Sequence, residues 1–290
     1  MKQRAVVVGL GQVGQPLLQL VERAGHTAVG VDLEPTTLPD KGETDVLHVC
    51  FPFEIPDFVG EATRYVELLE PGLTILNSTV AVGTTREVFA RTGRAIAYSP
   101  VRGKHARMVE ELLQYRKYVG GIDQDASSAA AAHFQSLGMT TRIVSAPETA
   151  ELSKLTETSY FGLLIAWAQE VERYCDLARQ SYDEVVSFYE EIAFFPPVKY
   201  TPGVIGGHCI LPNIDILGKL LDSELLAAVR SSNELKKQRS AFQPTSRLPA
   251  ALSSPADDSL MGSLNDSSRM RARSRLGARA ILNWAFTLRR

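Results

Sequence analysis

The chain has 290 residues, of which 44% are hydrophobic and 22% charged, a composition typical of a globular protein with a sizeable core. The formal net charge of -2 excludes a general polyanion binder, so we expect no nucleic-acid partner. No apolar run approaches the ~18 residues of a membrane span, and Cys50, Cys175 and Cys209 show no metal-type spacing, so we expect a cytoplasmic protein without a metal site.

The first half of the chain alternates strand and helix patterns. Short apolar or β-branched runs predict strands at residues 5–8, 28–31, 46–50, 73–76, 95–98, 118–120 and 141–144. Helical spacing predicts helices at residues 16–23, 61–69, 86–91 and 125–137. This alternation predicts an α/β, Rossmann-type domain over residues 1–148, with a doubly wound, mostly parallel sheet.

A glycine-rich turn follows the first predicted strand. In the spacing of Gly9, Gly11 and Gly14, the first glycine permits a tight turn, the second lets a pyrophosphate approach, and the third lets the helix pack closely. Asp32 ends the second strand, where a carboxylate accepts hydrogen bonds from a ribose and repels a 2′-phosphate. We therefore predict that NAD binds at Gly9, Gly11, Gln12, Val13, Gly14 and Asp32.

The second half predicts a smaller, all-helical domain over residues 149–239. One long central helix is expected at residues 149–178, about 45 Å at 1.5 Å per residue. Its apolar residues, Tyr160 and Trp167 among them, cover more than one stripe, which predicts a homodimer built partly on this helix. Shorter helices are predicted at residues 181–192, 214–221 and 224–236, the first with Ser181 as its N-cap.

Residues 240–290 have a different character. Residues 240–268 are rich in Ser, Pro and Ala and are expected to be a linker. Residues 269–290 hold seven arginines and no acid, so either a basic amphipathic tail or an unstructured one is expected.

Residues 203–210 form a second glycine-rich loop, with Gly206 and Gly207 shortly before Cys209. A thiol without bulky side chains beside it can act as a nucleophile once it is deprotonated. A small buried apolar residue beside a turn fits the same pattern, and both interpretations stay open for the loop alone.

Several blocks of residues 4 to 236, taken in order, resemble the UDP-glucose/GDP-mannose dehydrogenase family. They are the glycine turn with Asp32, Val49-Cys50-Phe51-Pro52, Asn77-Ser78-Thr79-Val80 with Gly83-Thr84-Thr85, Tyr98-Ser99-Pro100, Thr149-Ala150-Glu151-Leu152-Ser153-Lys154-Leu155, Gly206-Gly207-His208-Cys209 and Arg230-Ser231-Ser232-Asn233.

The resemblance implies oxidation of a primary alcohol of a nucleotide sugar to a carboxylate, with two NAD per turnover. It implies that Cys209 forms a thiohemiacetal and then a thioester, while Lys154 stabilises the oxyanion. Thr79 would position water, and His208 would be structural. It also implies that Pro52, Ser78 and Thr79 lie beside the dinucleotide, and that Asn213 occupies the position of a catalytic aspartate.

Three positions depart from the family pattern. Thr158 replaces an asparagine, Val101 replaces a glutamate, and Asn213 replaces an aspartate with an amide that cannot take a proton from water. Asp215 is the alternative acid if the loop carries an insertion. The family's third domain, which holds the nucleotide, has no expected counterpart in residues 240–290.

Three functions stay open at this point. The first is an NAD-dependent oxidoreductase that acts on a sugar derivative, such as a nucleotide sugar, through Cys209. The second is a two-electron alcohol or hydroxyacid dehydrogenase that uses Lys154 and needs no thioester. The third is an NAD-binding protein that has lost catalysis and acts as a sensor or partner subunit.

Overall fold

The computed structural model describes residues 2–33, 37–103, 107–189, 192, 200–207 and 209–242. The strands within these ranges are β1 (Arg4–Val8), β2 (Thr27–Val31), β3 (Val46–Val49), β4 (Leu73–Leu76), β5 (Ile96–Tyr98), β6 (Lys117–Gly121) and β7 (Thr141–Ile143). The helices are α1 (Gly14–Arg23), α2 (Phe58–Leu69), α3 (Thr84–Thr92), α4 (Met108–Gln114), α5 (Gln124–Ser136), α6 (Pro147–Ala178), α7 (Tyr182–Ser187), α8 (Ile210–Gly218) and α9 (Glu224–Phe242).

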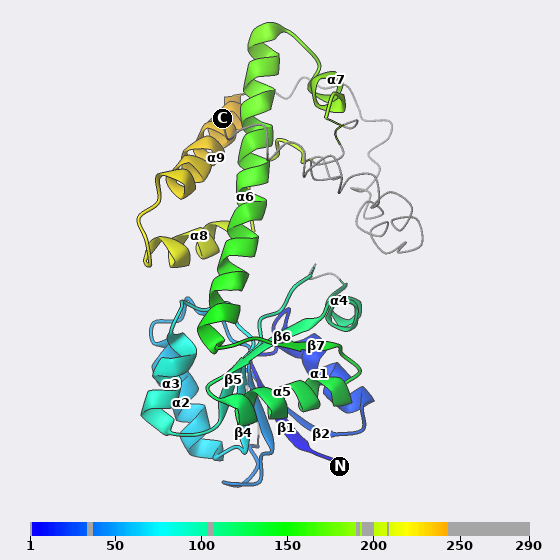
Figure 1. Cartoon of the computed structure of the whole chain (residues 1–290), viewed down its shortest axis with the longest axis vertical. Helices are drawn as coiled ribbons and strands as arrows, with labels where there is room; N and C mark the ends of the chain where they lie inside the picture. Colours follow the sequence, from blue (N-terminus) through cyan, green and yellow to red (C-terminus); the bar gives the residue numbers. More distant parts are fainter. Residues whose placement is uncertain are drawn as a thin grey trace, which may run out of the picture. The chain divides into compact units, whose positions relative to one another are not determined.

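The strands form one sheet in the order β2-β1-β3-β4-β5-β6-β7 (Figure 1). Every neighbouring pair is parallel except β5 and β6. The α/β fold expected from the sequence is therefore confirmed. The strand order reverses at β1, with β2 on one side and β3 on the other, and ligands of doubly wound sheets bind outside the carboxyl ends of the strands at such a switch point.

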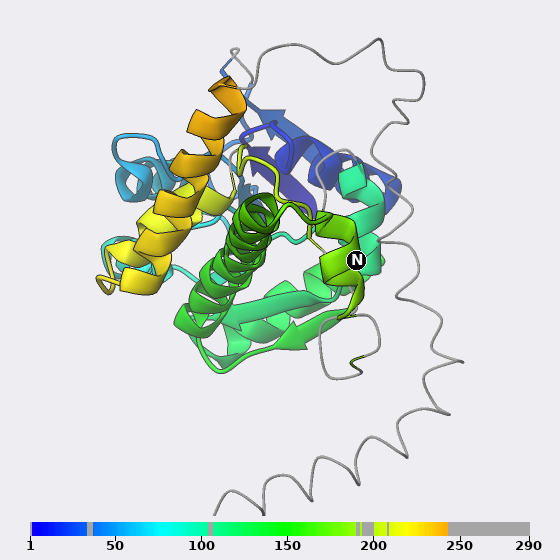
Figure 2. The ribbon, with the colours of Figure 1, turned by 90° about the horizontal axis from the view of Figure 1, so that it is seen from above.

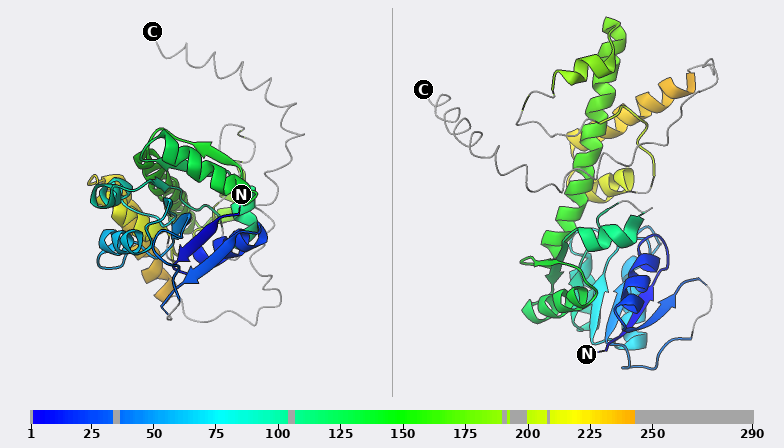
Figure 3. Two further views of the ribbon diagram at one scale, coloured as in Figure 1. Left: turned by 90° about the horizontal axis from the view of Figure 1, so that it is seen from below. Right: turned by 90° about the vertical axis from the view of Figure 1, so that its right-hand side faces the viewer.

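Helices cover both faces of the sheet (Figures 1 and 3). One core cluster joins the sheet to α1, α4 and α5 through residues such as Leu17, Leu112 and Phe134. The other joins the opposite face to α2 and α3 through residues such as Val66 and Val88. Both faces of every central strand are thus buried, which explains why the strands read as continuous apolar runs.

The chain divides into two compact units, one of residues 1–164 and 205–231, the other of residues 165–204 and 232–290. The boundary falls inside α6, which has 32 residues and contains the long helix expected from the sequence. Figure 2 views this helix from above. The domain limits at residues 148 and 239 stay predictions. No helix in the described part of the chain has the length and apolar character needed to cross a membrane.

Several boundaries differ from the predicted ones. Helix α4 has only seven residues and was not predicted, because two turns carry too little periodicity. Helix α7 begins at its Ser181 cap as expected but ends at Ser187. Helix α8 starts four residues earlier than predicted. Helix α9 extends to Phe242, into the expected linker, and residues 243–290 lie outside the described residues.

Candidate active site

The glycine turn after β1 has the geometry that a pyrophosphate needs. Gly9 has φ +88°, and a Cβ atom there would lie 2.6 Å from the Phe51 backbone nitrogen, in the loop after β3. A Cβ at Gly14 would lie 1.8 Å from the Gly9 carbonyl oxygen, so α1 packs directly against the turn. A Cβ at Gly11 would have no neighbour within 4 Å, which leaves an open approach to the backbone.

The start of α1 favours an anion. Its N-cap, Val13, offers no side-chain hydrogen bond, and its first turn contains no acidic residue. Backbone N–H groups at this end therefore keep the positive partial charge of the helix. The exposed Asp32 lies beside the turn, where its Oδ2 accepts a 3.3 Å hydrogen bond from the Leu10 N–H. Gln12 is exposed at the tip of the turn.

The loops after β3 and β4 are tied to each other. The buried Ser78 hydroxyl donates a 2.7 Å hydrogen bond to the Phe51 carbonyl, so it holds the loop that carries the exposed Pro52. Thr79 is half-buried at the same edge of the sheet. Burial raises the pKa of the Cys50 thiol to about 12, although Lys117 and a hydrogen bond with Asn77 act in the opposite direction. Cys50 is therefore a neutral thiol at pH 7 and is a poor nucleophile.

Lys117 is a buried lysine for which the sequence predicts no role. Its Nζ donates to the carbonyl oxygens of Ser99 and Pro100, at 2.9 and 3.0 Å, and fixes the loop after β5. Burial lowers the pKa of Lys117 to about 7, and the Coulombic influence of Cys50 raises it. Val101, which replaces the expected glutamate, packs into the apolar core. The only sequence signal for Lys117 is a charge at the start of an apolar strand.

Glu151 joins the start of α6 to the turn that follows Thr79. Its carboxylate is fully buried and accepts hydrogen bonds from the backbone N–H groups of Gly83 and Thr85, at 2.7 and 2.9 Å, and from the Thr85 hydroxyl, at 2.6 Å. Burial raises the pKa of Glu151, while these hydrogen bonds lower it. The sequence predicts no role for Glu151, although it lies in the family-like block of residues 149–155.

Lys154 follows one turn later on α6. Its side chain is 15% exposed, and its Nζ lies 3.5 Å from the Glu157 carboxylate. Thr158, which replaces the expected asparagine, donates its hydroxyl to the Lys154 carbonyl at 3.1 Å, within its own helix. The Thr158 hydroxyl is thus occupied by the helix backbone.

Cys209 is an exposed residue at the N-cap of α8. This end of the helix has no acidic residue in its first turn, so it favours an anion. Asn213 is buried on the next turn of α8. Asp215 is exposed and forms an ion pair with Arg230, so its carboxylate is already used. His208 lies outside the described residues.

Packing brings the predicted catalytic residues into one unit. Thr79, Lys154, Cys209 and Asn213 all belong to the unit of residues 1–164 and 205–231. Helix α8 packs on α6 at Gly162, where a Cβ would lie 2.7 Å from the Ile210 side chain. Among the described residues, Lys154 and Cys209 form no hydrogen bond with each other, and Lys154 pairs with Glu157 instead.

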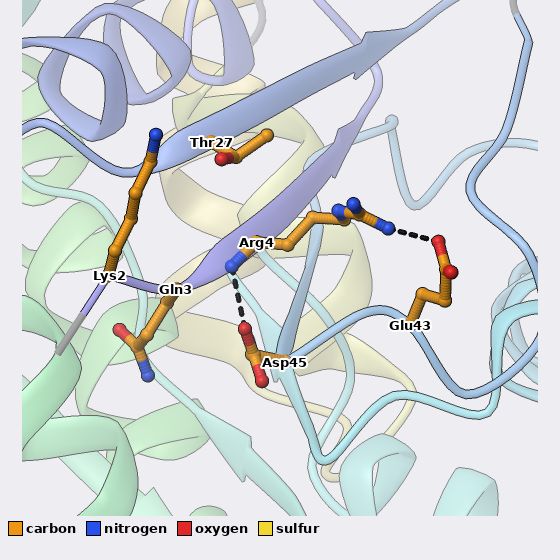
Figure 4. A pocket seen from close by; sticks show the side chains of 6 residues that line it. All are labelled: Lys2, Gln3, Arg4, Thr27, Glu43 and Asp45. Atoms are coloured by element: carbon orange, nitrogen blue, oxygen red, sulfur yellow. Dashed lines mark hydrogen bonds and ion pairs between the residues drawn. The ribbon is translucent and has the colours of Figure 1, made fainter.

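A shallow polar pocket of about 390 Å³ lies elsewhere, at the amino end of β1 (Figure 4). Lys2, Gln3, Arg4, Thr27, Glu43 and Asp45 line it. Arg4 forms an ion pair with Glu43, and its backbone N–H donates to Asp45 at 2.6 Å. Arg4, Glu43 and Asp45 thus satisfy one another, and the pocket is at the opposite end of β1 from the glycine turn. No metal-ligand group of three His, Cys, Asp or Glu side chains occurs in the described ranges.

Comparisons with known proteins agree with this architecture. Residues 148–235 match the model of the UDP-glucose/GDP-mannose dehydrogenase family, central domain. A UDP-N-acetyl-D-mannosamine dehydrogenase from Methanocaldococcus jannaschii is 24% identical over 284 residues, which cover 80% of this chain and 65% of that protein. The chain thus spans slightly less than two thirds of that relative.

Two solved structures share the fold. The UDP-D-ManNAc dehydrogenase from Pyrococcus horikoshii superposes with a TM-score of 0.72 at 22% identity, covering 82% of this chain and 70% of that one. The 3-hydroxyisobutyrate dehydrogenase from Mycobacterium tuberculosis gives a TM-score of 0.63 at 17% identity, covering 83% of this chain and 95% of that one. Residues 148–235 therefore match the central domain of the UDP-glucose/GDP-mannose dehydrogenase family, and the chain as a whole shares the fold of these dehydrogenases.

Proposed function

We propose that this chain is an NAD-dependent oxidoreductase that oxidises a primary alcohol of a nucleotide sugar. The observation that carries the proposal is the turn at Gly9, Gly11 and Gly14, which combines a tight turn at positive φ, an open backbone approach and close helix packing. The relatives named as UDP-N-acetyl-D-mannosamine dehydrogenases support the substrate class.

The residues present fit a dinucleotide. The open space at Gly11 and the uncapped start of α1 would hold its pyrophosphate, with Gln12 and Val13 in the turn. Asp32 would bind the adenosine ribose and would repel a 2′-phosphate, which favours NAD over NADP. Pro52, Ser78 and Thr79 line the same edge one and two strands further on. When bound, NAD would supply the hydride acceptor.

The remaining chemistry belongs to the chain's own residues. After the alcohol loses a hydride and a proton, the Cys209 thiolate would add to the aldehyde carbon and form a thiohemiacetal. Lys154 would stabilise the developing oxyanion with its partly buried charge. Loss of a second hydride and a proton, which needs a second NAD, would give a thioester. Water, oriented by Thr79 and Asn213, then releases the carboxylic acid and restores the thiol.

Two departures from the family pattern fall on the last step, because Val101 is apolar and packed and Asn213 cannot take a proton. The third, Thr158, removes an amide donor to the oxyanion, and its hydroxyl donates to its own helix instead. We therefore expect thioester hydrolysis to be the slow step. If Asn213 limits this step, Asn213→Asp would accelerate acid release.

A two-electron dehydrogenase that uses Lys154 alone is the second candidate. The likeness to the mycobacterial 3-hydroxyisobutyrate dehydrogenase, which covers 95% of that protein, favours it as far as the fold is concerned. In this case Cys209→Ser would keep full turnover. A chain that binds NADH but oxidises no alcohol would instead be a sensor or partner subunit.

Calorimetry on Gly11→Val tests the cofactor site. We expect NAD affinity to fall by at least ~100-fold, about 2.7 kcal/mol, because the valine side chain fills the approach to the pyrophosphate. Gly218→Val is the matched control, because a Cβ at Gly218 also has no neighbour within 4 Å. An NAD affinity in Gly11→Val equal to that of the control would refute the site.

A further inference from the structure

The end of the sheet furthest from β2 carries a cluster of arginines stacked on tyrosines. The Arg102 guanidinium carbon lies 5.0 Å from the centre of the Tyr118 ring and 5.7 Å from that of Tyr115. The Arg142 guanidinium carbon lies 5.6 Å from the same Tyr118 ring. Two cations therefore share one aromatic ring, which holds both of them in place.

Strand pairing accounts for this arrangement. Tyr118 on β6 and Arg142 on β7 are direct partners in the parallel ladder, so their side chains leave the same face of the sheet. Val119, the next residue, packs into the core cluster with α1, α4 and α5, and Tyr118 consequently faces the other way. Arg102 reaches this face from the loop after β5, where its Nη2 donates a 2.8 Å hydrogen bond to the Arg116 carbonyl.

These arginines lack the carboxylate partners that most others in the described ranges have. Neither Arg102 nor Arg142 forms an ion pair with a described acidic residue, and Arg142 is exposed. Arg64 provides the contrast. It also lies over a tyrosine, 4.3 Å from the Tyr65 ring centre, but it donates two hydrogen bonds to Glu61, at 2.9 and 2.6 Å.

Arg102 is close enough to other basic residues to interact with them. Lys117 is the neighbour of Tyr118 on β6, and burial lowers its pKa, with smaller contributions in the same direction from the charges of Arg102 and Lys154. Guanidinium groups held in fixed positions without a counter-charge match phosphate oxygens in a bidentate manner. A bound anion would neutralise the mutual repulsion of these cations.

The cluster lies on the ligand-binding edge of the sheet, yet away from the glycine turn. Tyr98 on β5 pairs with Gly120, so Lys117 to Val119 extend past the carboxyl end of β5. Three strands separate β1 from β6, which places the cluster about 19 Å from the glycine turn at ~4.8 Å per strand. It is only about 10 Å from the end of β4, where Thr79 follows.

We propose that Arg102, Arg142 and Tyr118 form a phosphate-binding site that is separate from the dinucleotide turn. Its ligand is a phosphate group of the substrate, which extends from a reacting carbon near Thr79 toward β6 and β7. Assigning the phosphate to the substrate rests on the proposed function, whereas the existence of the site does not.

Titration calorimetry of the full chain with inorganic pyrophosphate at low ionic strength tests the site. We expect wild-type protein to bind pyrophosphate, and Arg142→Gln to bind it at least tenfold more weakly. Arg142 is suited to this test because it is exposed and its described contact is with the Tyr118 ring alone. Arg64→Gln is the control and should keep the wild-type affinity. Saturating pyrophosphate should leave the affinity for NADH within twofold of its value without pyrophosphate.

Three results would overturn the inference: no pyrophosphate binding by wild type, equal binding by Arg142→Gln, or competition between pyrophosphate and NADH. The last would mean that the probe occupies the glycine turn. The first is also expected if the arginines serve an acidic protein partner. Failure of the proposed function would look different. The protein would then not bind NADH, while Arg142→Gln would still bind pyrophosphate more weakly than Arg64→Gln.

Discussion

At the scale of single residues, burial decides which titratable groups can take part in chemistry. Cys50 and Cys209 both lie in family-like blocks, but burial raises the pKa of Cys50 to about 12, whereas Cys209 is exposed at a helix start. The family-like blocks point to Cys209 as the reacting thiol, but the raised pKa of Cys50 could not be predicted from the sequence, because it depends on neighbours distant in the sequence. The same holds for Lys117, whose acceptors lie 17 and 18 residues away.

A buried histidine pair predicts how stability depends on pH. His48 on β3 and His133 on α5 are joined by a 2.9 Å hydrogen bond between their Nε2 atoms, and His48 also contacts the Asn77 amide. Burial lowers the pKa of His48, and it lowers that of His133 from 6.5 to about 4. The folded state therefore favours neutral rings, while the unfolded state binds protons below pH 6.5.

We expect the contribution of His133 to the free energy of unfolding to be fully present above pH 6.5 and to fall by roughly 3 kcal/mol as the pH drops to 4, with a further loss from His48 in the same direction. Lys117 does not alter this trend, because below pH 6 it is protonated in both states. Urea denaturation across this pH range measures how the free energy of unfolding depends on pH, and His133→Gln should make that dependence weaker. A slope of the same size in His133→Gln would contradict the assignment.

At the scale of elements, the long helix and the sheet could be predicted. Short helices, and helix caps supplied by residues distant in the sequence, could not. Residues 149–178 have enough periodicity to indicate α6, and the apolar runs indicate the strands. The start of α8 at Cys209 was missed because glycine-rich sequence precedes it. The capping of α3 by Glu151 was missed because the two are more than 60 residues apart.

Glu151→Gln tests this connection between α6 and the turn after β4. An amide has only one acceptor oxygen for the three donors of Gly83 and Thr85, so we expect a loss of about 2–3 kcal/mol in the free energy of unfolding. Glu148→Gln removes an exposed ion pair with Arg86 on the same helix and should cost about 0–1 kcal/mol. Equal losses in the two variants, measured by urea denaturation, would mean that Glu151 has no special role.

At the scale of the whole molecule, the exposed aromatic residues of α6 support a homodimer. Tyr160, Trp167 and Tyr174 follow each other at intervals of seven residues, so they lie on one face, and they are 53, 56 and 57% exposed. Such an apolar stripe on an isolated helix face favours association.

We expect light scattering at micromolar concentration to give the mass of two 31.8 kDa chains. Trp167→Glu should weaken the dimer at least tenfold, because it places a charge in the stripe. Leu68→Glu, at a 45% exposed position on α2, should leave the mass unchanged. A monomeric wild type would remove the basis for this interface.

The central claim is that the chain oxidises a nucleotide sugar with NAD through Cys209, and one experiment tests it directly. Wild-type protein is mixed with NAD and a panel of nucleotide sugars that includes UDP-N-acetyl-D-mannosamine, while NADH absorbance and intact mass are recorded together. We predict a burst of NADH, slow turnover afterwards, and an acyl adduct on Cys209 that Cys209→Ser lacks. No NADH from any member of the panel would contradict the claim, and full turnover by Cys209→Ser with no adduct in the wild type would contradict its covalent mechanism.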